Sequence, residues 1–439
     1  MSSVYTGVSV VVPTRNRADI AANAVRSALA QEGCGELRVL VSDNSTNAEE
    51  AARLADFCAG ASDPRLGYVR PPEPLAMSEH WDWAARQALG LFDLSHVTYL
   101  TDRMIFKRGA LARLARVAAA HPAEVVSYMH DRVDDDARPF RAYLNAWSGR
   151  LLRADAAGLL RATAESALTE ALPRMLNCLA PRATLESLRA RFGNYFSSIA
   201  PDFSFCYRLL ASEDSFLYLD ESLLVHYALG RSNGASASRG EMTRDRADFM
   251  AASRAHAYSA APIPGILTVH NAIIHEYCVL RAETGGPKFP PVDMPKYLHA
   301  VAAELPQLVN PEARRETERL LAEHGWVDAE AAARAQPIWR KALSPRRVWD
   351  RLARDAQSLR RRVAPPAPEP SPSAPGFETV AEALDYAASH AGRELEPDYW
   401  RREGARFGFA EVAADEAPSA APTKEGDPLA SGATARGVR

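Results

Sequence analysis

The sequence lacks the features that mark several common classes of protein. Its 439 residues contain no apolar run near the roughly 18 residues of a membrane span, and residues 1–17 lack the basic start and long apolar stretch of a signal peptide. The five cysteines include no CxxC pair, which favours reduced thiols over a disulfide framework or a zinc site. A net charge of −3 gives no overall nucleic-acid footprint. We therefore expect a cytoplasmic protein that does not bind nucleic acid.

Strand and helix patterns alternate over the first 130 residues. Residues 8–12 are wholly apolar and predict a strand buried on both faces, which Pro13 ends. Further strands are expected over residues 37–42, 68–69, 96–100 and 124–129, and helices over 19–30, 49–58, 81–91 and 110–120. This order predicts an α/β fold with a Rossmann-like parallel sheet. Ligands of such sheets bind outside the carboxyl ends of the strands.

Later patterns predict a more helical chain. Residues 151–191 are rich in Ala, Leu and Arg and indicate helix, whereas residues 215–227 indicate two short β segments around a turn. Helical patterns dominate again from residue 242 to about residue 339. A Pro/Ala/Ser linker at 364–376 is followed by a short helical segment at 377–415 and a tail at 416–439 that is expected to be disordered.

Polar motifs stand directly after three of the expected strands. The first is Pro13, Thr14, Arg15, Asn16 and Arg17, which offers backbone N–H groups, guanidinium groups and an amide to an anionic ligand. The second contains Asp43, Asn44 and Ser45, and the third contains Asp102, Arg103 and Met104. Each motif alone also suits a capped turn between a strand and a helix. Their common position at strand ends predicts one shared site.

These motifs, with the segment MSEHWDWAARQALG between the second and third, resemble the nucleotide-binding half of family 2 inverting glycosyltransferases. The resemblance is strongest over residues 7–112 and continues more loosely to residue 235 through Ala200, Pro201 and Asp202. It implies a GT-A type domain over residues 1–235, with a mostly helical extension at 236–345. It also implies a nucleoside-diphosphate sugar as donor and a glycan or lipid-linked molecule as acceptor.

The resemblance assigns roles to the motif residues. The donor would be bound by the first two motifs, with Asp43 facing the base and Asp102 facing the ribose and diphosphate. Ser78, Glu79 and Trp81 lie where the family has a helix beside the donor. Asp202 would be the general base that deprotonates the acceptor, and Glu213 and Asp214 are alternatives. Asp202 also suits a helix cap, since it follows a proline. His226 would lie on the acceptor or diphosphate side, although a lone histidine near an apolar strand is more often structural.

The third motif departs from the family pattern at the metal site. The family usually has Asp-any-Asp, whose last carboxylate binds Mg²⁺ or Mn²⁺, whereas this chain has Met104, and a thioether suits neither ion. Three interpretations follow. Arg103 replaces the metal by neutralising the leaving diphosphate; Asp102 alone retains a metal; or the protein binds nucleotide sugars without turnover, as a scaffold. The run Asp134, Asp135 and Asp136 is a second candidate metal site, although its polar surroundings favour a solvated loop.

Residues 346–363 predict a basic amphipathic helix, with several arginines around an apolar face. Such a helix is suited to rest on an anionic membrane surface, near a lipid-linked acceptor. The same pattern suits a solvated helix packed on the enzyme, or an acidic partner. The expected location is therefore cytoplasmic, with peripheral contact at the inner membrane face as one alternative.

Overall fold

The computed structural model describes residues 4–136, 138–197, 199–232, 258–326, 374–395 and 407–412, with the single residues 236, 239, 247 and 404. The first half holds β1 (Gly7–Thr14), α1 (Ala18–Leu29), β2 (Glu36–Asp43), α2 (Ala48–Ala61), β3 (Leu66–Val69), α3 (Met77–Leu91), β4 (His96–Tyr99), β5 (Met104–Phe106), α4 (Ala110–Ala120), β6 (Val126–Asp134) and β7 (Phe140–Tyr143). The middle holds β8 (Leu151–Asp155), α5 (Ala156–Ala164), η1 (Met175–Asn177), β9 (Cys178–Pro181), α6 (Arg182–Phe192), α7 (Pro201–Ser212), β10 (Ser215–His226) and η2 (Leu229–Arg231). The remainder holds α10 (Val269–Glu283), α11 (Met294–Ala303), η3 (Leu305–Gln307), α12 (Pro311–Glu323), β11 (Gly376–Phe377), α16 (Val380–Ser389) and β12 (Phe409–Glu411).

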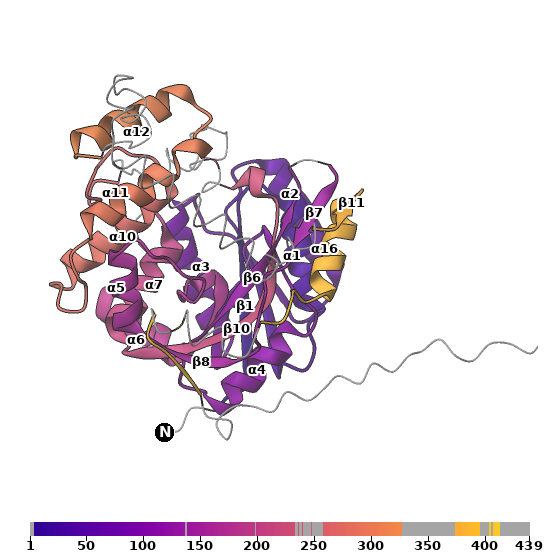
Figure 1. Cartoon of the computed structure of the whole chain (residues 1–439). Helices are drawn as coiled ribbons and strands as arrows, with labels where there is room; N and C mark the ends of the chain where they lie inside the picture. Colours follow the sequence, from indigo (N-terminus) through magenta and orange to yellow (C-terminus); the bar gives the residue numbers. More distant parts are fainter. Residues whose placement is uncertain are drawn as a thin grey trace, which may run out of the picture.

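The described strands form one mixed sheet, which Figure 1 shows with helices around it. Its main path runs β12-β8-β10-β6-β9-β4-β1-β2-β3. The four strands β4, β1, β2 and β3 are parallel, so their carboxyl ends lie at one edge. Beyond them, β9 pairs antiparallel with both β4 and β6 and joins this half to the rest. The predicted α/β class with a Rossmann-like parallel core is confirmed.

Two apolar cores cover the two faces of the sheet, because successive strand residues point to opposite sides. Val11 and Leu40 belong to one core with α3, α5, α6, α7 and α10, while Val10 and Val12 belong to the other with α1 and α4. The wholly apolar strand β1 is thus explained by burial on both sides. Packing on both faces fixes the strands, and the loops after the parallel strands therefore lie at one edge of the sheet.

The structure corrects four expectations about element bounds. β1 runs through Pro13 to Thr14. The pairing of β1 with β4 covers only Val8 to Val11, so Pro13, which has no N–H, is not needed as a donor to β4. The expected strand at 124–129 continues to Asp134, since β7 and β10 extend its pairing. Residues 151–191 are not continuously helical, because β8 and β9 pair within the sheet. Residues 215–227 form one long strand, β10, whose register shifts between Leu219 and Leu224 in place of a turn.

The C-terminal segment returns to the sheet. Its helix α16 lies beside α1 and β7 in Figure 1 and packs Leu384 against Ile20 and Val225. The short strands β11 and β12 pair with β7 and β8. Lys107 donates from Nζ to the carbonyl of His390 at 2.6 Å, which fastens the end of this segment. The predicted helical segment at 377–415 therefore also contributes a strand to the sheet.

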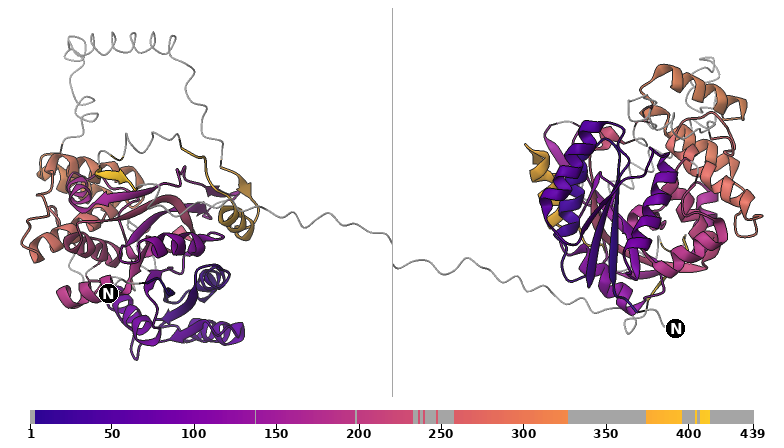
Figure 2. Two further views of the ribbon diagram at one scale, coloured as in Figure 1. Left: turned by 90° about the horizontal axis from the view of Figure 1, so that it is seen from below. Right: turned by 180° about the vertical axis from the view of Figure 1, so that it is seen from behind.

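The helical extension packs on one side of the molecule, where α10 lies against α5 and α7, α11 packs on α10, and α12 packs on α11 (Figure 1). The same arrangement is seen from below and from behind in Figure 2. The boundary at residue 235 and the predicted basic helix at 346–363, linker at 364–376 and tail at 416–439 lie wholly or mainly outside the described residues. Within the described part of the chain, no helix is long and apolar enough to cross a membrane. All five cysteines are free.

Candidate donor and catalytic site

The loops after β1 and β2 are tied together by side-chain hydrogen bonds. Asn16 has a positive φ of 56° and accepts from the N–H groups of Thr46 and Asn47 at 2.9 Å, while its own N–H donates to Ser45 Oγ at 2.8 Å. Arg15 and Asn44 both donate to the carbonyl of Leu75, just before α3. Three segments far apart in the sequence therefore form one preorganised rim at the carboxyl edge of the sheet.

Asp43 lies at the end of β2 with no exposed side-chain surface. Its carboxylate accepts from the Tyr68 hydroxyl and the Ser45 N–H, both at 2.8 Å, and lies 3.6 Å from Arg70 Nε. Burial raises the pKa of Tyr68, and the hydrogen bond to Asp43 and the charge of Asp43 raise it further. Asp43 thus holds a tyrosine and an arginine in place at the rim, a link that the sequence pattern did not show.

The helix expected beside the donor begins at this rim. Ser78 stands in the first turn of α3 and is half-buried. Trp81 is 6% exposed, and its ring packs on Tyr99 and Phe196 in the core. Trp81 therefore positions α3 by packing, and a direct contact with a donor stays a prediction for Ser78.

Asp102 follows β4 and contacts two residues of the motif after β1, Thr14 and Arg17. Thr14 Oγ1 donates to Asp102 Oδ2 at 2.9 Å, and Arg17 Nη1 lies 3.5 Å from Oδ1. Met104 stands in β5 opposite His226 and is 2% exposed, with its side chain in the apolar core beside α1 and α4. The position that aligns with the usual metal-binding carboxylate therefore faces the core and offers no ligand. Asp102 is already used by Thr14 and Arg17, so these residues do not fit a divalent ion.

The acidic run at 134–136 does not supply such a site either. Asp134 belongs to strand β6, contrary to the loop interpretation, and Asp136 is exposed. Burial raises the pKa of Asp135. Among the described residues, no three His, Cys, Asp or Glu side chains gather into a group that could hold a metal ion.

Arg103 and His226 form the centre of a second cluster. The antiparallel pairing of β5 with β10 brings the two together, and the Arg103 carbonyl accepts from the Tyr227 N–H at 3.0 Å. Arg103 Nη1 donates to His226 Nε2 at 2.7 Å, so His226 must be neutral with its proton on Nδ1. Burial and then the Arg103 charge hold the pKa of His226 well below its usual range. Burial lowers the pKa of Arg103 to about 10, which leaves it charged at neutral pH.

Further polar residues extend this cluster across the sheet. The rings of His130 and His226 lie 5.8 Å apart, and His130 Nδ1 is 3.3 Å from Glu170. Glu170 in turn accepts from Arg174 Nη2 at 3.4 Å. The Nε of Arg174 is buried without a hydrogen-bond partner among the described residues. A second guanidinium therefore faces the same region as Arg103, although no pattern around residue 174 marked it.

Asp202 opens α7, and its carboxylate interacts electrostatically with both Arg174 and Arg103. It is half-buried, and burial raises its pKa against the lowering effects of Arg174, of the N–H groups of Phe203 and Asp202, and of Arg103. A partly accessible carboxylate that is more basic than usual suits proton abstraction. The alternative bases Glu213 and Asp214 lie at the other end of α7, and Asp214 pairs with Lys288 at 2.7 Å.

The helical extension fixes the loop that carries Asp202. Glu276 of α10 is fully buried, and its Oε1 accepts from the N–H groups of Ile199 and Ala200 at 2.9 and 2.8 Å. Both donors lie just before the first turn of α7. Glu276 is therefore a positioning residue for Asp202, and its role depends on tertiary contact that sequence spacing does not reveal.

Comparison with known proteins identifies part of the chain. Residues 9–166 match the family model Glycosyl transferase family 2. Among solved structures, the chain is similar to S. aureus TarS 1–349 in complex with UDP-GlcNAc, with 14% identity and a TM-score of 0.40 over 71% of this chain and 83% of that one. It is also similar to S. aureus TarS, with 14% identity and a TM-score of 0.38 over 71% of this chain and 50% of that one. No curated protein matches the chain.

Proposed function

We propose that the site transfers the sugar of a nucleoside-diphosphate donor to an acceptor hydroxyl with inversion, because residues 9–166 match the model of glycosyl transferase family 2. The observation that carries the proposal is the pairing of Arg103 with neutral His226 beside Asp202, at 2.7 Å. It sets a buried cation and a basic carboxylate on one site at the carboxyl edge of the sheet.

Donor binding is assigned to the rim formed by the loops after β1, β2 and β3. Tyr68 and Arg70, held by Asp43, border the nucleoside position, and Arg15 and Arg17 border the diphosphate. Backbone N–H groups and guanidinium groups suit such an anion. The rim is closed by its own hydrogen bonds before any donor arrives, which lowers the entropic cost of binding.

In the transfer step, the acceptor oxygen attacks the anomeric carbon from the face opposite the diphosphate. Its proton goes to Asp202, and the bond from the anomeric carbon to the diphosphate oxygen breaks. Negative charge then grows on the leaving diphosphate, where Arg103 stabilises it. Arg174 supplies a second positive charge near Asp202. The acceptor is assigned as a glycan or a lipid-linked molecule only by the family resemblance.

The same geometry supports stabilisation of the leaving group without a metal ion. Met104 faces the core and Asp102 is engaged by Thr14 and Arg17, so the usual carboxylate ligands are not offered. Arg103 stands next to Asp102 in the chain and bonds His226 from the other side. Neutral His226 accepts a hydrogen bond from the guanidinium and orients it toward the site.

The experiment is a binding panel followed by product analysis. Thermal unfolding of the purified full chain is measured with nucleoside diphosphates and their sugars, each with EDTA and with Mn²⁺. A selective rise in melting temperature identifies the donor class, because a bound ligand stabilises the folded state by mass action. The anomeric configuration of any product then tests inversion. Folded protein that responds to no nucleotide would contradict the proposal.

A further inference from the structure

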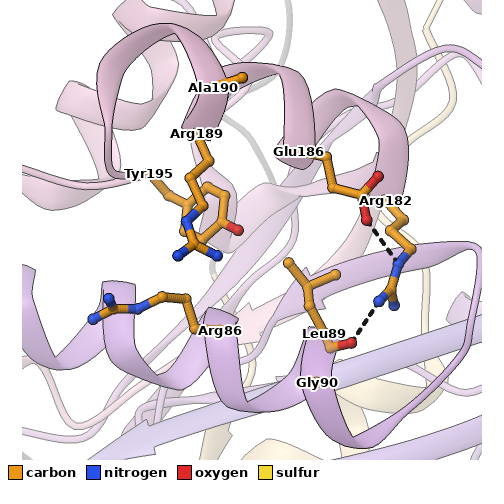
Figure 3. Close-up of a pocket in the computed structure, with 8 residues that line it drawn as sticks. All are labelled: Arg86, Leu89, Gly90, Arg182, Glu186, Arg189, Ala190 and Tyr195. Atoms are coloured by element: carbon orange, nitrogen blue, oxygen red, sulfur yellow. Dashed lines mark hydrogen bonds and ion pairs between the residues drawn. The ribbon is translucent and has the colours of Figure 1, made fainter.

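A separate cavity of about 520 Å³ opens between α3 and α6 (Figure 3). Its lining includes Arg86 and Leu89 from α3 and Arg182, Glu186, Arg189 and Tyr195 from α6 and the loop after it. The donor rim meets the other end of α3, near Ser78. With a rise of 1.5 Å per residue, the eight residues from Ser78 to Arg86 place the cavity about 12 Å farther along the helix.

One of the three arginines has its donors used within the protein. Arg182 pairs with Glu186 at 3.0 Å and donates to the carbonyls of Phe92 and Leu89 at 2.9 and 2.5 Å. These contacts fasten α6 to the end of α3, as the dashed lines in Figure 3 show in part. Arg182 therefore forms part of the cavity wall, and a ligand would be bound by Arg86 and Arg189.

Arg86 and Arg189 are held in place by buried groups. Asp82 is 7% exposed; its Oδ2 lies 3.2 Å from Arg86 Nε, and its Oδ1 accepts from the Tyr195 N–H at 2.7 Å. Burial raises the pKa of Tyr195, and the charge and hydrogen bond of Arg189 oppose that rise. Asp82 contacts Arg86 at Nε, and no hydrogen bond from the terminal nitrogens of Arg86 is found among the described residues. Figure 3 shows the Arg189 side chain reaching from α6 toward α3, and the Arg86 side chain running along α3 with its guanidinium group turned away from Leu89.

Arg86 and Arg189 both line the cavity, where their positive charges repel each other and a bound anion would relieve that repulsion. Guanidinium groups match the oxygens of a phosphate group in geometry and charge. The volume falls within the roughly 300–1,000 Å³ of small-molecule sites, and Leu89, Gly90 and Ala190 offer an apolar wall to the rest of a ligand. We propose that this cavity binds a phosphorylated small molecule, with its phosphate group between Arg86 and Arg189.

The test is calorimetric titration of the full chain with inorganic phosphate and with glucose 6-phosphate, with glucose as the neutral control. The double variant Arg86→Gln/Arg189→Gln is expected to weaken binding about tenfold or more, because two charged hydrogen-bond donors are lost. The matched control is Arg314→Gln/Arg319→Gln on α12, which removes two arginines paired with glutamates on an exposed helix face. That control is expected to bind like the wild type.

A further titration, with the Arg103→Ala variant, distinguishes binding at the cavity from binding at the donor site. Binding at the cavity is expected to persist in Arg103→Ala, whereas loss in that variant alone would assign the anion to the donor site and overturn the proposal. Absence of binding in folded wild type, or unchanged binding in the double variant, would overturn it too. Should the double variant not fold, Arg86→Lys and Arg189→Lys keep the charge and lose the forked geometry, and each is expected to weaken binding severalfold.

Discussion

The two halves of the site differ in how their polar groups are satisfied. In the donor rim, Asn16, Asn44 and Asp43 each accept one or more hydrogen bonds from neighbouring loops. In the cluster around Arg103, a buried guanidinium group with a lowered pKa lies beside His226, which burial and the Arg103 charge keep neutral. The rim is thus stabilised by contacts that exist without ligand. The cluster instead holds charge in a poorly solvated place, where it acts more strongly on a reacting group.

This difference teaches where substitutions should act. Loss of one hydrogen bond in the rim should weaken donor binding by the free energy of that single bond, because the remaining hydrogen bonds keep the loops in place. Loss of a cluster charge should act on the transition state and lower kcat far more than it changes KM.

The largest effect is expected at Asp202. Asp202→Asn removes the proton acceptor, and kcat should fall about 10²–10⁴-fold while donor affinity stays unchanged. The measurement is initial rate against donor concentration, with nucleotide binding followed separately.

Asp214→Asn is the matched control, since Asp214 is an exposed carboxylate at the other end of α7. It should retain wild-type kcat. A loss in Asp214→Asn with full activity in Asp202→Asn would reassign the base and break the comparison.

Arg103→Lys should lower kcat about 10²-fold, because an ammonium group cannot bond His226 and the diphosphate with the forked geometry of a guanidinium. The pH profile of kcat/KM should also change. In the wild type, activity should rise as Asp202 ionises, at a pH above the usual aspartate range, and fall as Arg103 loses its proton near pH 10. In Arg103→Lys the alkaline limb should move to lower pH, since burial lowers a lysine pKa further. An alkaline limb that stays in place would show that Arg103 does not control it.

Glu276→Gln tests whether the helical extension positions the base. The amide oxygen is neutral, so it replaces two charge-assisted bonds to the loop before Asp202 with weaker ones, and kcat should fall about tenfold with an unchanged donor KM. The free energy of unfolding should fall by about 1–3 kcal/mol. Glu283→Gln changes an exposed carboxylate on the same helix and should leave both quantities unchanged. Equal losses in kcat and donor affinity would indicate general unfolding instead of positioning.

Stability should fall in acid because several histidines are buried in the neutral form. Burial lowers the pKa of His80 and His96 to about 4, below the unfolded value near 6.5. The unfolded state therefore binds protons that the folded state does not, and stability is lost as pH falls from about 6.5 toward 4. Thermal unfolding between pH 7 and 4.5 at constant salt measures this. A melting temperature that is flat over this range would contradict the buried neutral state.

Tyr68→Phe should have the smallest effect. It removes one hydrogen bond to Asp43, worth about 1 kcal/mol, so donor KM should rise a fewfold with unchanged kcat. The comparison is sharpened by measuring both constants in one assay. A large loss of kcat would show that the rim takes part in the transfer step itself.

The sequence predicted the parallel core and the meeting of its three strand-end motifs. Strongly apolar strands such as β1 and the polar residues after them depend on local pattern, which spacing reveals. Arg174 and Glu276 were not predicted, because each reaches the site through tertiary packing from a segment with no motif. The inward orientation of Met104 was also hidden, since it depends on the pairing of β5 with β10. The pairing of β11 and β12 with the sheet was not predicted either, because it also depends on tertiary contacts.

The central claim is that Arg103 takes the place of a metal ion. The most direct measurement is the transfer rate of wild type and Arg103→Ala in EDTA and in Mn²⁺, with the donor identified by the binding panel. The account predicts that the wild-type rate is the same in both conditions and that Arg103→Ala is about 10²–10³-fold slower in both. A wild-type rate that is lost in EDTA and restored by Mn²⁺, with Arg103→Ala behaving like the wild type, would contradict it.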